Sequence, residues 1–384
     1  MHIAWLGKKL PFCGNVTYGR ETTNALLDRG HRVSFFHFSA SEGDPESSSQ
    51  GNDDFSEVSL PYIYKSQIYT IPSLRSSRIL KEALRQLRPD VVHASLALSP
   101  LDFKLPEICA ELGLPLVATF HPAFDAQRRN FTSNTQQLTY QIYAPFLAEY
   151  HRVIVFSEVQ RQLLHRLGVP SAKISVIPNG VDASKYSPGI TYQKAQFQAE
   201  RLFVYQGRLS LEKNVEALLR AWRHSDMGPV SKLVIMGGGP LEAMLKALYG
   251  EDPSIAWLGF VADERRRIEI LRAADVFILP SLVEGLSLSL LEAMACQTAC
   301  IATDVGADGE VLERGAGIVL TAQRVATQLQ TLLPLCRDQP ELTRRLGQLA
   351  RERVMERYTL KDNITQLEAL YQQLQQRVAL SQIR

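Results

Sequence analysis

Short apolar runs alternate with longer segments whose apolar residues fall on one helical face, and this alternation continues along nearly the whole chain. In the first half of the chain, the runs with the length of buried strands are 3–6, 32–38, 90–93, 116–120, 152–156 and 174–177. The helical patterns between them are 18–29, 106–112 and 158–167. Ser157 stands where it can cap the last of these helices. Because strands that alternate with helices require crossover connections, the pattern predicts a parallel sheet.

A second series of the same kind follows. Its strand-length runs are 202–205, 233–236, 255–258, 276–279 and 300–302. The segment from 183 to about 200 lacks apolar periodicity, and we interpret it as a linker between the two series. We therefore expect an α/β protein with two Rossmann-like domains, residues 1–182 and 183–363, whose parallel sheets face a cleft.

One acidic segment, 40–58, interrupts this alternation. It contains six Asp or Glu residues and no Lys or Arg, and it is otherwise rich in Ser and Gly. A segment with so little apolar surface cannot offset the entropy that ordering would cost. We therefore expect a solvated, mobile loop there.

The composition excludes several classes of protein. With 384 residues the chain is long enough for two domains, and its 45% hydrophobic and 21% charged content is that of a soluble globular protein. The net charge of +2 is far from the basic excess of most nucleic-acid binders. No apolar run reaches the ~18 residues of a spanning helix. The apolar start precedes Lys8 and Lys9, which is the reverse of a signal peptide. The five scattered cysteines favour a reducing, cytoplasmic location.

The most informative pattern is a pair of carboxylates around an apolar helix at 286–296. Glu284 stands just before this helix and Glu292 lies within it. With a helix start near Ser287, the two carboxylates reach groups ~10 Å apart, and the electropositive helix end lies between them. That spacing fits a nucleotide sugar, whose diphosphate lies at the helix end and whose sugar and ribose hydroxyls reach the carboxylates. The alternative is that Glu292 pairs with an arginine and that Glu284 is an ordinary loop residue.

The Glu-x7-Glu spacing in this context resembles the signature of retaining glycosyltransferases of the family-four type, which have the two-domain GT-B fold. The segment 207–214, Gly-Arg-Leu-Ser-Leu-Glu-Lys-Asn, is similar to another segment of that family. The resemblance implies that His121, Arg208, Lys213 and Glu284 are catalytic. Physically, the two cations can neutralise the charge of a departing nucleoside diphosphate. Taken alone, Lys213 could equally be a surface residue.

The same resemblance implies further contacts with the donor. His121, at the end of the predicted strand 116–120, resembles a histidine that contacts the donor sugar near the reacting carbon; it could otherwise be a core residue. In the first loop, where the family has Gly-Gly, this chain has Gly14 followed by Asn15. The donor-binding residues that the resemblance implies are Gly14, Gly207, Gly238, Phe260, Val261, Gly285, Leu286, Ser287, Leu288 and Glu292.

The resemblance extends to the domain organisation and to the mechanism. The segment 176–182 is similar to the family's domain-joining segment, and the helical pattern at the carboxyl end implies that 364–384 crosses back to complete the first domain. Retention in this family is explained by front-face attack, in which the departing phosphate takes the acceptor's proton. No metal-ligand spacing is present in the sequence, so we expect activity without a divalent ion and with the nucleotide sugar as the only co-substrate.

The acceptor is indicated by charge and aromatic content. Residues 60–180 carry 13 Lys or Arg and 8 Asp or Glu. The clustered cations are Arg75, Arg78, Lys81, Arg85, Arg88, Arg128 and Arg129. The aromatic residues expected to be exposed near them are Tyr62, Tyr64, Tyr69, Phe124, Phe131, Tyr140, Tyr143 and Phe146. Such a mixture suits an anionic membrane surface, although a solvated helix face explains the cations equally well.

The first third of the chain is similar to the cyanobacterial digalactosyldiacylglycerol synthase group. This resemblance implies UDP-galactose as donor, a galactolipid as acceptor and peripheral attachment to a membrane. The alternatives are a transferase that forms sucrose-like or polysaccharide products and a nucleotide-sugar epimerase on the same fold. A non-catalytic scaffold fits less well, because the five candidate polar residues are present together. They are His121, Arg208, Lys213, Glu284 and Glu292. A dinucleotide-dependent oxidoreductase lacks its Gly-x-Gly-x-x-Gly turn after the first strand.

Overall fold

The computed structural model describes residues 1–10, 14–39, 54–66, 69–96, 98–123 and 131–382. The chain divides into two compact units. The amino-terminal unit comprises Met1–Pro122, Asn130–Pro178 and Leu360–Arg384, and the carboxy-terminal unit contains Asn179–Thr359. Among the helices of the described ranges, none is both long and apolar enough to cross a bilayer.

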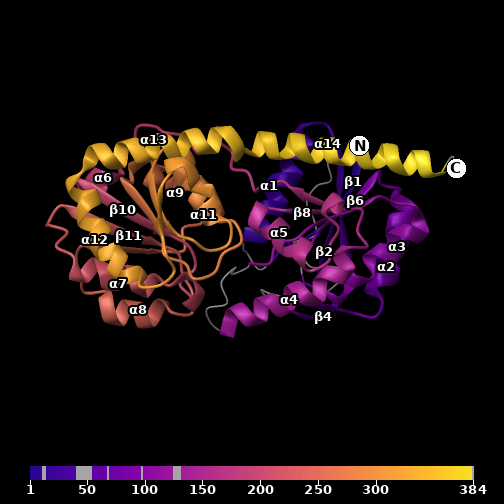
Figure 1. Cartoon of the computed structure of the whole chain (residues 1–384), viewed down its shortest axis with the longest axis horizontal. Helices are drawn as coiled ribbons and strands as arrows, with labels where there is room; N and C mark the ends of the chain where they lie inside the picture. The colour runs from indigo at the N-terminus through magenta and orange to yellow at the C-terminus, as the bar shows by residue number, and fades with distance from the viewer. Residues whose placement is uncertain (11–13, 40–53, 67–68, 97, 124–130, 383–384) are drawn as a thin grey trace. The chain divides into compact units, whose positions relative to one another are not determined.

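The amino-terminal unit is built on a seven-stranded parallel sheet in the order β3-β2-β1-β6-β7-β8-β9 (Figure 1). The strands are β1 (His2–Leu6), β2 (Arg32–Phe38), β3 (Phe55–Leu60), β6 (Val91–Ser95), β7 (Leu116–Thr119), β8 (Arg152–Val155) and β9 (Ile174–Val176). Its helices are α1 (Gly14–Asp28), α2 (Ser76–Leu87), α3 (Leu105–Leu112), α4 (Phe131–Leu147), α5 (Glu158–Arg166) and α14 (Leu360–Gln382). As predicted, Ser157 caps α5 by accepting a hydrogen bond from the backbone N–H of Gln160.

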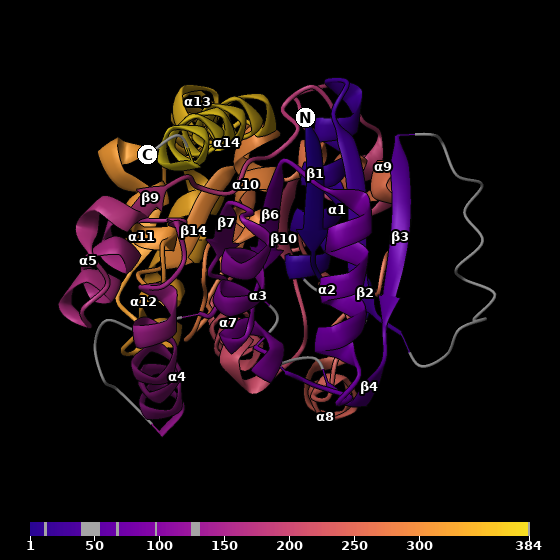
Figure 2. The same cartoon turned by 90° about the vertical axis from the view of Figure 1, so that its right-hand side faces the viewer.

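The prediction that 40–58 is one loop is wrong at its carboxyl end. Residues 40–53 lie outside the described part, but Phe55–Leu60 forms β3 at the edge of the sheet, beside β2 (Figure 2). The Ser56 hydroxyl lies 2.8 Å from that of Ser34. The Glu57 carboxylate lies 3.2 Å from Lys9 Nζ. An edge strand tolerates polar side chains because its backbone pairing and one solvated face do not require apolar residues, so composition misled the prediction.

The last helix, α14, belongs to the amino-terminal unit and packs against α1 (Figure 1). Its Tyr371 hydroxyl lies 2.5 Å from Nδ1 of the buried His93 on β6. Its Glu368 pairs with Arg29 at 2.5 Å. The helix is therefore attached both to the core of this sheet and to its surface.

The carboxy-terminal unit has a six-stranded parallel sheet in the order β12-β11-β10-β13-β14-β15. The strands are β10 (Arg201–Gln206), β11 (Ser231–Met236), β12 (Ile255–Gly259), β13 (Val276–Leu279), β14 (Ala299–Thr303) and β15 (Ile318–Leu320). Its helices include α6 (Gln193–Gln196), α7 (Val215–His224), α8 (Glu242–Tyr249), α9 (Glu264–Ala273), α10 (Leu288–Ala295), α11 (Asp308–Val311), α12 (Val325–Asp338) and α13 (Pro340–Arg357). The expected class, α/β with two parallel-sheet Rossmann-like domains, is confirmed.

The segment 183–200, interpreted from the sequence as a linker, is packed within the carboxy-terminal unit. Gln193 at the start of α6 is buried, and its amide donates to the Glu269 carboxylate at 3.1 Å. The Thr191 hydroxyl donates to the Glu269 carbonyl at 3.1 Å. Polar contacts, and not an apolar face, hold this segment in place. The apolar pattern of the sequence therefore did not predict that the segment is packed.

Candidate active site

The carboxyl ends of β10, β11 and β12 are joined backbone to backbone. The Gly207 N–H donates to the Met236 carbonyl at 2.9 Å, and the Gly237 N–H donates to the Gly259 carbonyl at 2.7 Å. A Cβ on Gly237 would stand 1.8 Å from the Gly207 carbonyl oxygen, and its φ of +136° is itself a glycine conformation. The glycines expected beside the nucleotide therefore allow two strand ends to touch, and they leave this edge of the sheet without side chains.

The turn that follows β10 is attached to the turn that follows β13. The Leu282 N–H donates to the Glu212 carbonyl at 2.7 Å. Asn214, in the left-handed region with φ 51°, donates its side-chain amide to the Pro280 carbonyl at 3.1 Å. These bonds hold 208–214 and 280–284 as one platform, although the two segments are about 70 residues apart in the sequence.

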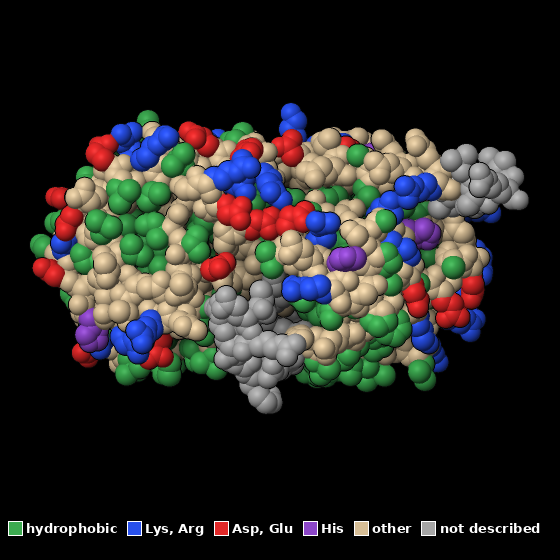
Figure 3. Space-filling model, viewed as in Figure 1, with side chains coloured by type: hydrophobic (Ala, Val, Ile, Leu, Met, Phe, Trp, Pro, Cys, Tyr) green, Lys and Arg blue, Asp and Glu red, His purple; other side chains and the backbone are tan. Residues whose placement is uncertain are grey.

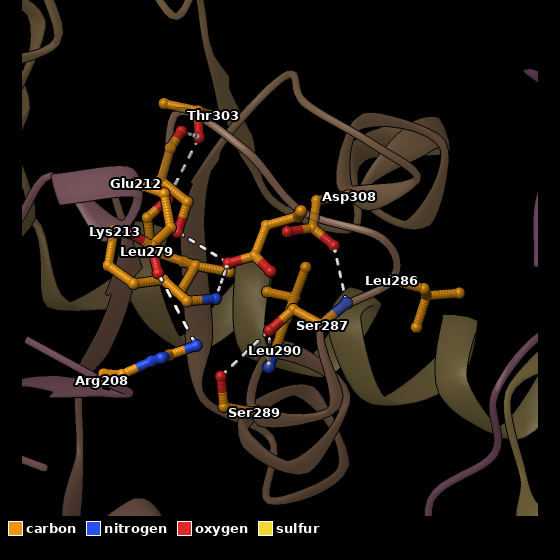
Figure 4. A network of polar contacts seen from close by, with 12 residues as sticks. Arg208, Glu212, Lys213, Leu279, Leu286, Ser287, Ser289, Leu290, Thr303 and Asp308 are labelled. Carbon is orange, nitrogen blue, oxygen red and sulfur yellow. Dashed lines mark hydrogen bonds and ion pairs between the residues drawn. The ribbon is translucent and has the colours of Figure 1, made fainter. Parts of the chain in front are cut away.

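Lys213 and Glu284 meet on this platform. Nζ of Lys213 lies 2.5 Å from Oε1 of Glu284, and the Ser281 hydroxyl donates to the same oxygen at 2.7 Å (Figure 4 shows Lys213 in this network). Glu284 is only 7% exposed. A buried carboxylate is tolerated because a cation and a hydroxyl compensate it. Lys213 is thus not an isolated surface lysine, and Glu284 is not an ordinary loop residue.

Arg208 lies beside this pair with its side chain 45% exposed. Its guanidinium is 3.8 Å from the Glu212 carboxylate, an ion pair too long for a strong hydrogen bond (Figure 4). The Arg208 carbonyl accepts a hydrogen bond from the buried Tyr205 hydroxyl at 2.8 Å. The backbone of Arg208 is therefore fixed while its charged group still reaches solvent.

The start of α10 is held by a turn that sequence reasoning missed. Ser287 caps the helix by accepting from the Leu290 N–H, and its own N–H donates to the Asp308 carboxylate at 3.0 Å (Figure 4). A Cβ on Gly306 would stand 2.3 Å from the Glu284 carbonyl oxygen. The Ala307 N–H donates to the Gly285 carbonyl at 2.7 Å. The signal was a glycine-containing turn, Val-Gly-Ala-Asp-Gly at 305–309, directly after a predicted strand.

Asp308 supplies a third carboxyl group near Lys213, in addition to those of Glu212 and Glu284. It is 1% exposed, and its Oδ2 has no hydrogen-bond partner among the described residues. Burial, together with the neighbouring charge of Glu284, raises the pKa of Asp308 well above its ordinary value. Burial therefore makes the ionised form of Asp308 less favourable than that of an exposed aspartate.

Glu292 faces different partners from those of Glu284. Its carboxylate accepts from the Gln206 side-chain amide at 2.6 Å. Burial raises the pKa of Glu292 to about 7, although hydrogen bonds from Gln206 and Tyr186 and the charge of Arg267 act against that shift. Arg267 acts on Glu292 through its charge, whereas the hydrogen bonds come from the amide of Gln206 and the phenol of Tyr186. The sequence pattern did not indicate Gln206 or Tyr186, because neither lies in a recognised motif.

The remaining donor-side residues follow β12. Phe260 is 66% exposed, and Val261 is buried. Gly259 just before them has φ +62°, which turns the chain at the strand end. The structure thus gathers most of the expected residues at the carboxyl edge of one sheet, where open α/β sheets bind ligands. Those in the carboxy-terminal unit are Gly207, Arg208, Lys213, Gly238, Phe260, Val261, Glu284, Gly285, Leu286, Ser287, Leu288 and Glu292.

His121 and Gly14 belong to the amino-terminal unit. His121 follows β7, and its Nε2 lies 2.8 Å from the Ser95 hydroxyl at the end of β6. Burial, reinforced by the positive charge of Lys8, lowers the pKa of His121 to about 3. Gly14 starts α1, and a Cβ there would have no neighbour within 4 Å among the described residues. His121 is therefore neutral at physiological pH, and Gly14 is not required by packing.

Two family models match successive parts of the chain: "Glycosyltransferase Family 4" at residues 14–185 and "Glycosyl transferases group 1" at residues 191–353. The chain is 32% identical over 253 residues to the Escherichia coli protein named UDP-Gal:alpha-D-GlcNAc-diphosphoundecaprenol alpha-1,3-galactosyltransferase. That alignment covers 62% of this chain and 64% of the relative, slightly less than two thirds of the relative's length.

Two solved structures have the same fold. The Anabaena protein HepE in complex with UDP superimposes with a TM-score of 0.76 at 16% identity, over 97% of this chain and 100% of that one. Sucrose-phosphate synthase from Thermosynechococcus elongatus gives 0.77 at 21% identity, over 97% and 98%. The two solved structures show that the chain has the GT-B fold. The two family models, which together account for most of the sequence, identify the chain as a glycosyltransferase of the family-four type.

Proposed function

We propose that this chain transfers a hexose from a nucleotide sugar to an acceptor hydroxyl and retains the configuration at the anomeric carbon. The observation that carries the proposal is the ion pair between the half-buried Lys213 and the buried Glu284, beside the partly exposed Arg208, on a platform at the carboxyl edge of a parallel sheet. Two cations fixed there can stabilise the charge that develops on a departing diphosphate. The start of α10 adds backbone N–H groups and a positive dipole end to the same place.

The donor's two halves would meet different carboxylates. We assign Glu284 to the transferred sugar and Glu292 to the ribose, whose hydroxyls donate to a carboxylate when it is ionised. In the transfer step the bond between the anomeric carbon and the phosphate oxygen breaks, and the bond to the acceptor oxygen forms on the same face. The acceptor proton passes to the departing phosphate oxygen. Because Arg208 and Lys213 supply the neutralising charge, no divalent ion is needed in this proposal.

We propose UDP-galactose as the donor. The name of the Escherichia coli relative includes UDP-Gal, and the Anabaena neighbour holds UDP; both statements describe those proteins and support the assignment here. Thermal-shift screening with UDP-, GDP- and ADP-sugars tests the base and the sugar. A protein stabilised by UDP-galactose alone agrees with the proposal, whereas stabilisation by only GDP- or ADP-sugars contradicts it. Release of isomerised sugar without an acceptor would instead indicate an epimerase.

For the acceptor we propose a membrane glycolipid, with digalactosyldiacylglycerol synthesis as the specific reaction. The Escherichia coli relative is named for a lipid-linked acceptor. In this chain, the antiparallel hairpin of β4 (Tyr62–Lys65) and β5 (Thr70–Pro72) carries exposed apolar side chains. We call these the hairpin surface: Ile63 (70% exposed), Tyr64 (49%), Tyr69 (45%), Ile71 (39%) and Leu74 (96%).

Exposed cations follow the hairpin surface in the sequence, on α2 and at the two ends of that helix. Arg75, Arg78, Arg85 and Arg88 are exposed, and Arg78 pairs with Glu82 at 3.0 Å. Figure 3 shows apolar side chains gathered along the lower edge of the amino-terminal unit, over α4 and β4. Exposed apolar groups with adjacent cations are the combination that an anionic bilayer surface binds.

The prediction of exposed aromatic residues is wrong for two of them. Tyr140 and Tyr143 are buried, and their hydroxyls bond to the Pro122 carbonyl and the Asp102 carboxylate. Amphipathic rings often fill a core when their hydroxyl finds a partner there, so sequence spacing alone could not separate the two cases. Phe124, Arg128, Arg129 and the side chain of Phe131 lie outside the described residues.

Flotation with vesicles tests the membrane proposal. We expect the wild type to float with vesicles that contain anionic lipid, and less so at high salt. The double variant Ile63→Asp/Leu74→Asp should remain in the soluble fraction. Ile190→Asp, at an 88% exposed site of the other unit, is the matched control and should float like the wild type. A wild type that fails to float at both low and physiological salt would contradict the proposal.

A further inference from the structure

A chain of hydrogen bonds leads from α1 to His121. Asn15 donates its side-chain amide to the Leu96 carbonyl at 3.3 Å. Because a carbonyl can only accept, this contact fixes the NH2 side of the amide toward Leu96 and leaves Oδ1 facing Ser95. The Ser95 hydroxyl donates to that Oδ1 at 2.8 Å. Asn15 stands where the family resemblance places a second glycine, so the chain of bonds depends on a residue that departs from the family pattern.

The Ser95 hydroxyl has a single proton, and the bond to Asn15 uses it. Its contact with Nε2 of His121, at 2.8 Å, therefore requires the imidazole to be the donor. Burial keeps the imidazole neutral near pH 7, since the pKa of His121 is lowered to about 3. A neutral imidazole with its proton on Nε2 has a lone pair on Nδ1.

The ring of His121 is also held from its sides. Tyr18 meets it edge-on with centroids 5.0 Å apart, and Phe156 lies 5.2 Å away. Within the described ranges, Nδ1 of His121 has no hydrogen-bond partner in the protein. A fixed acceptor without a protein partner is suited to a ligand that brings its own donor.

We propose that Asn15 and Ser95 are positioning residues that hold His121 in the Nε2-protonated tautomer, so that Nδ1 accepts a hydrogen bond from a hydroxyl of the transferred sugar. The second half of this statement rests on the proposed function; the tautomer does not. If the Ser95 hydroxyl did not donate its proton to Asn15, it could donate to Nε2 of His121 instead. The tautomer with the proton on Nδ1 would then become accessible. Nδ1 would then carry a proton and could only donate, so it could no longer accept the hydrogen bond from the sugar hydroxyl.

The tautomer can be measured in the protein without any substrate. Long-range proton–nitrogen correlation spectra of 15N-histidine-labelled protein distinguish the protonated ring nitrogen from the unprotonated one, and a His121→Gln variant identifies the resonances. We expect the proton on Nε2 in the wild type. Asn15→Leu and Ser95→Ala should shift the spectrum toward the other tautomer or a mixture. Asn24→Leu, at an exposed position of the same helix, is the matched control and should leave it unchanged. Protonation on Nδ1 in the wild type, or no change in both network variants, overturns the proposal.

Kinetics then separate the two claims. Asn15→Leu should lower kcat/KM for the sugar donor about tenfold, the effect of one misdirected hydrogen bond, while Asn24→Leu keeps the wild-type value. A protein with the expected tautomer that transfers no sugar refutes the proposed function and leaves the tautomer assignment intact. An active enzyme whose rate ignores both Asn15→Leu and Ser95→Ala refutes the role of Nδ1 in sugar binding. Circular dichroism and melting temperature show whether each variant is folded.

Discussion

The two units use opposite electrostatic arrangements at the carboxyl ends of their strands. In the carboxy-terminal unit, oppositely charged side chains lie in a pair, Lys213 with Glu284, at 2.5 Å. In the amino-terminal unit, burial lowers the pKa values of both His93 and His121 to about 3, and a chain of neutral hydrogen bonds connects them to their surroundings. In the proposed function, the ion pair acts on the charge of a diphosphate, and the neutral histidine accepts from a sugar hydroxyl.

Breaking the charged pair should have the largest effect. We expect Lys213→Ala to lower kcat about 10²- to 10³-fold, because it removes a cation from the leaving group and leaves Glu284 buried without its ion partner. Lys246→Ala removes an exposed lysine that pairs with Glu242 and serves as the control. Steady-state rates, with unfolding curves to show that the variant is folded, test this. A Lys213→Ala rate within twofold of the wild type would exclude the assigned role.

Arg208→Lys sharpens the same comparison, because it keeps the charge and removes the planar fork. We expect kcat to fall about 10- to 100-fold while the protein keeps its stability, since the Arg208 side chain is half exposed. Measured kcat and melting temperature together test this. If Arg208→Lys keeps the wild-type kcat, charge alone is sufficient at this position. The proposed bidentate contact of the guanidinium with phosphate would then be wrong.

The pH dependence of donor binding tests Glu292. Its carboxyl has a pKa of about 7, and in the proposed donor site the ionised form is the stronger acceptor for the two ribose hydroxyls. KM for UDP-galactose should therefore fall several-fold from pH 6 to pH 8, because the diphosphate of a nucleotide sugar does not titrate in this range. Glu292→Gln should show a flat profile. His121 titrates far below this window and should not contribute. An unchanged slope in Glu292→Gln would assign the dependence to another group.

The same raised pKa affects stability in the opposite direction. A carboxyl whose pKa is higher in the folded state stabilises the fold when it is protonated, and this contribution is lost as the pH rises through about 7. The free energy of unfolding of the wild type, relative to Glu292→Gln, should therefore decrease between pH 5 and pH 8. Urea denaturation at several pH values measures it. An increase over that range would contradict the burial of this carboxyl.

The smallest expected effects are those of substitutions at two glycines, one in each unit. Gly237→Ala places a Cβ against the Gly207 carbonyl at a positive φ, so we expect a loss of about 2–3 kcal/mol in the free energy of unfolding. Gly14→Ala adds a methyl group to open space at the start of α1 and should change stability by less than about 0.5 kcal/mol. Denaturant unfolding compares the two variants, and equal effects would contradict the close approach of the strand ends.

The sequence predicted the repetitive part of the fold because buried parallel strands are apolar runs and the helices between them have one apolar face. It also singled out Lys213, Glu284 and Glu292 as candidate site residues, because they stand in motifs that follow strands, and their role stays a prediction. It missed β3, Asp308, Gln206 and the role of Asn15. These residues act through contacts between segments 20 to 90 positions apart, such as Ser287–Asp308 and Gln206–Glu292, and no local pattern records such contacts.

The most direct test of the central claim is the configuration of the product. Wild-type protein incubated with UDP-galactose and vesicles containing a monogalactosyl lipid, in excess chelator, should release UDP and form a new α-galactosidic bond. The small coupling of the anomeric proton in the product identifies that bond. A β-linked product, transfer only after Mg²⁺ or Mn²⁺ is restored, or no transfer from any nucleotide sugar would contradict the account.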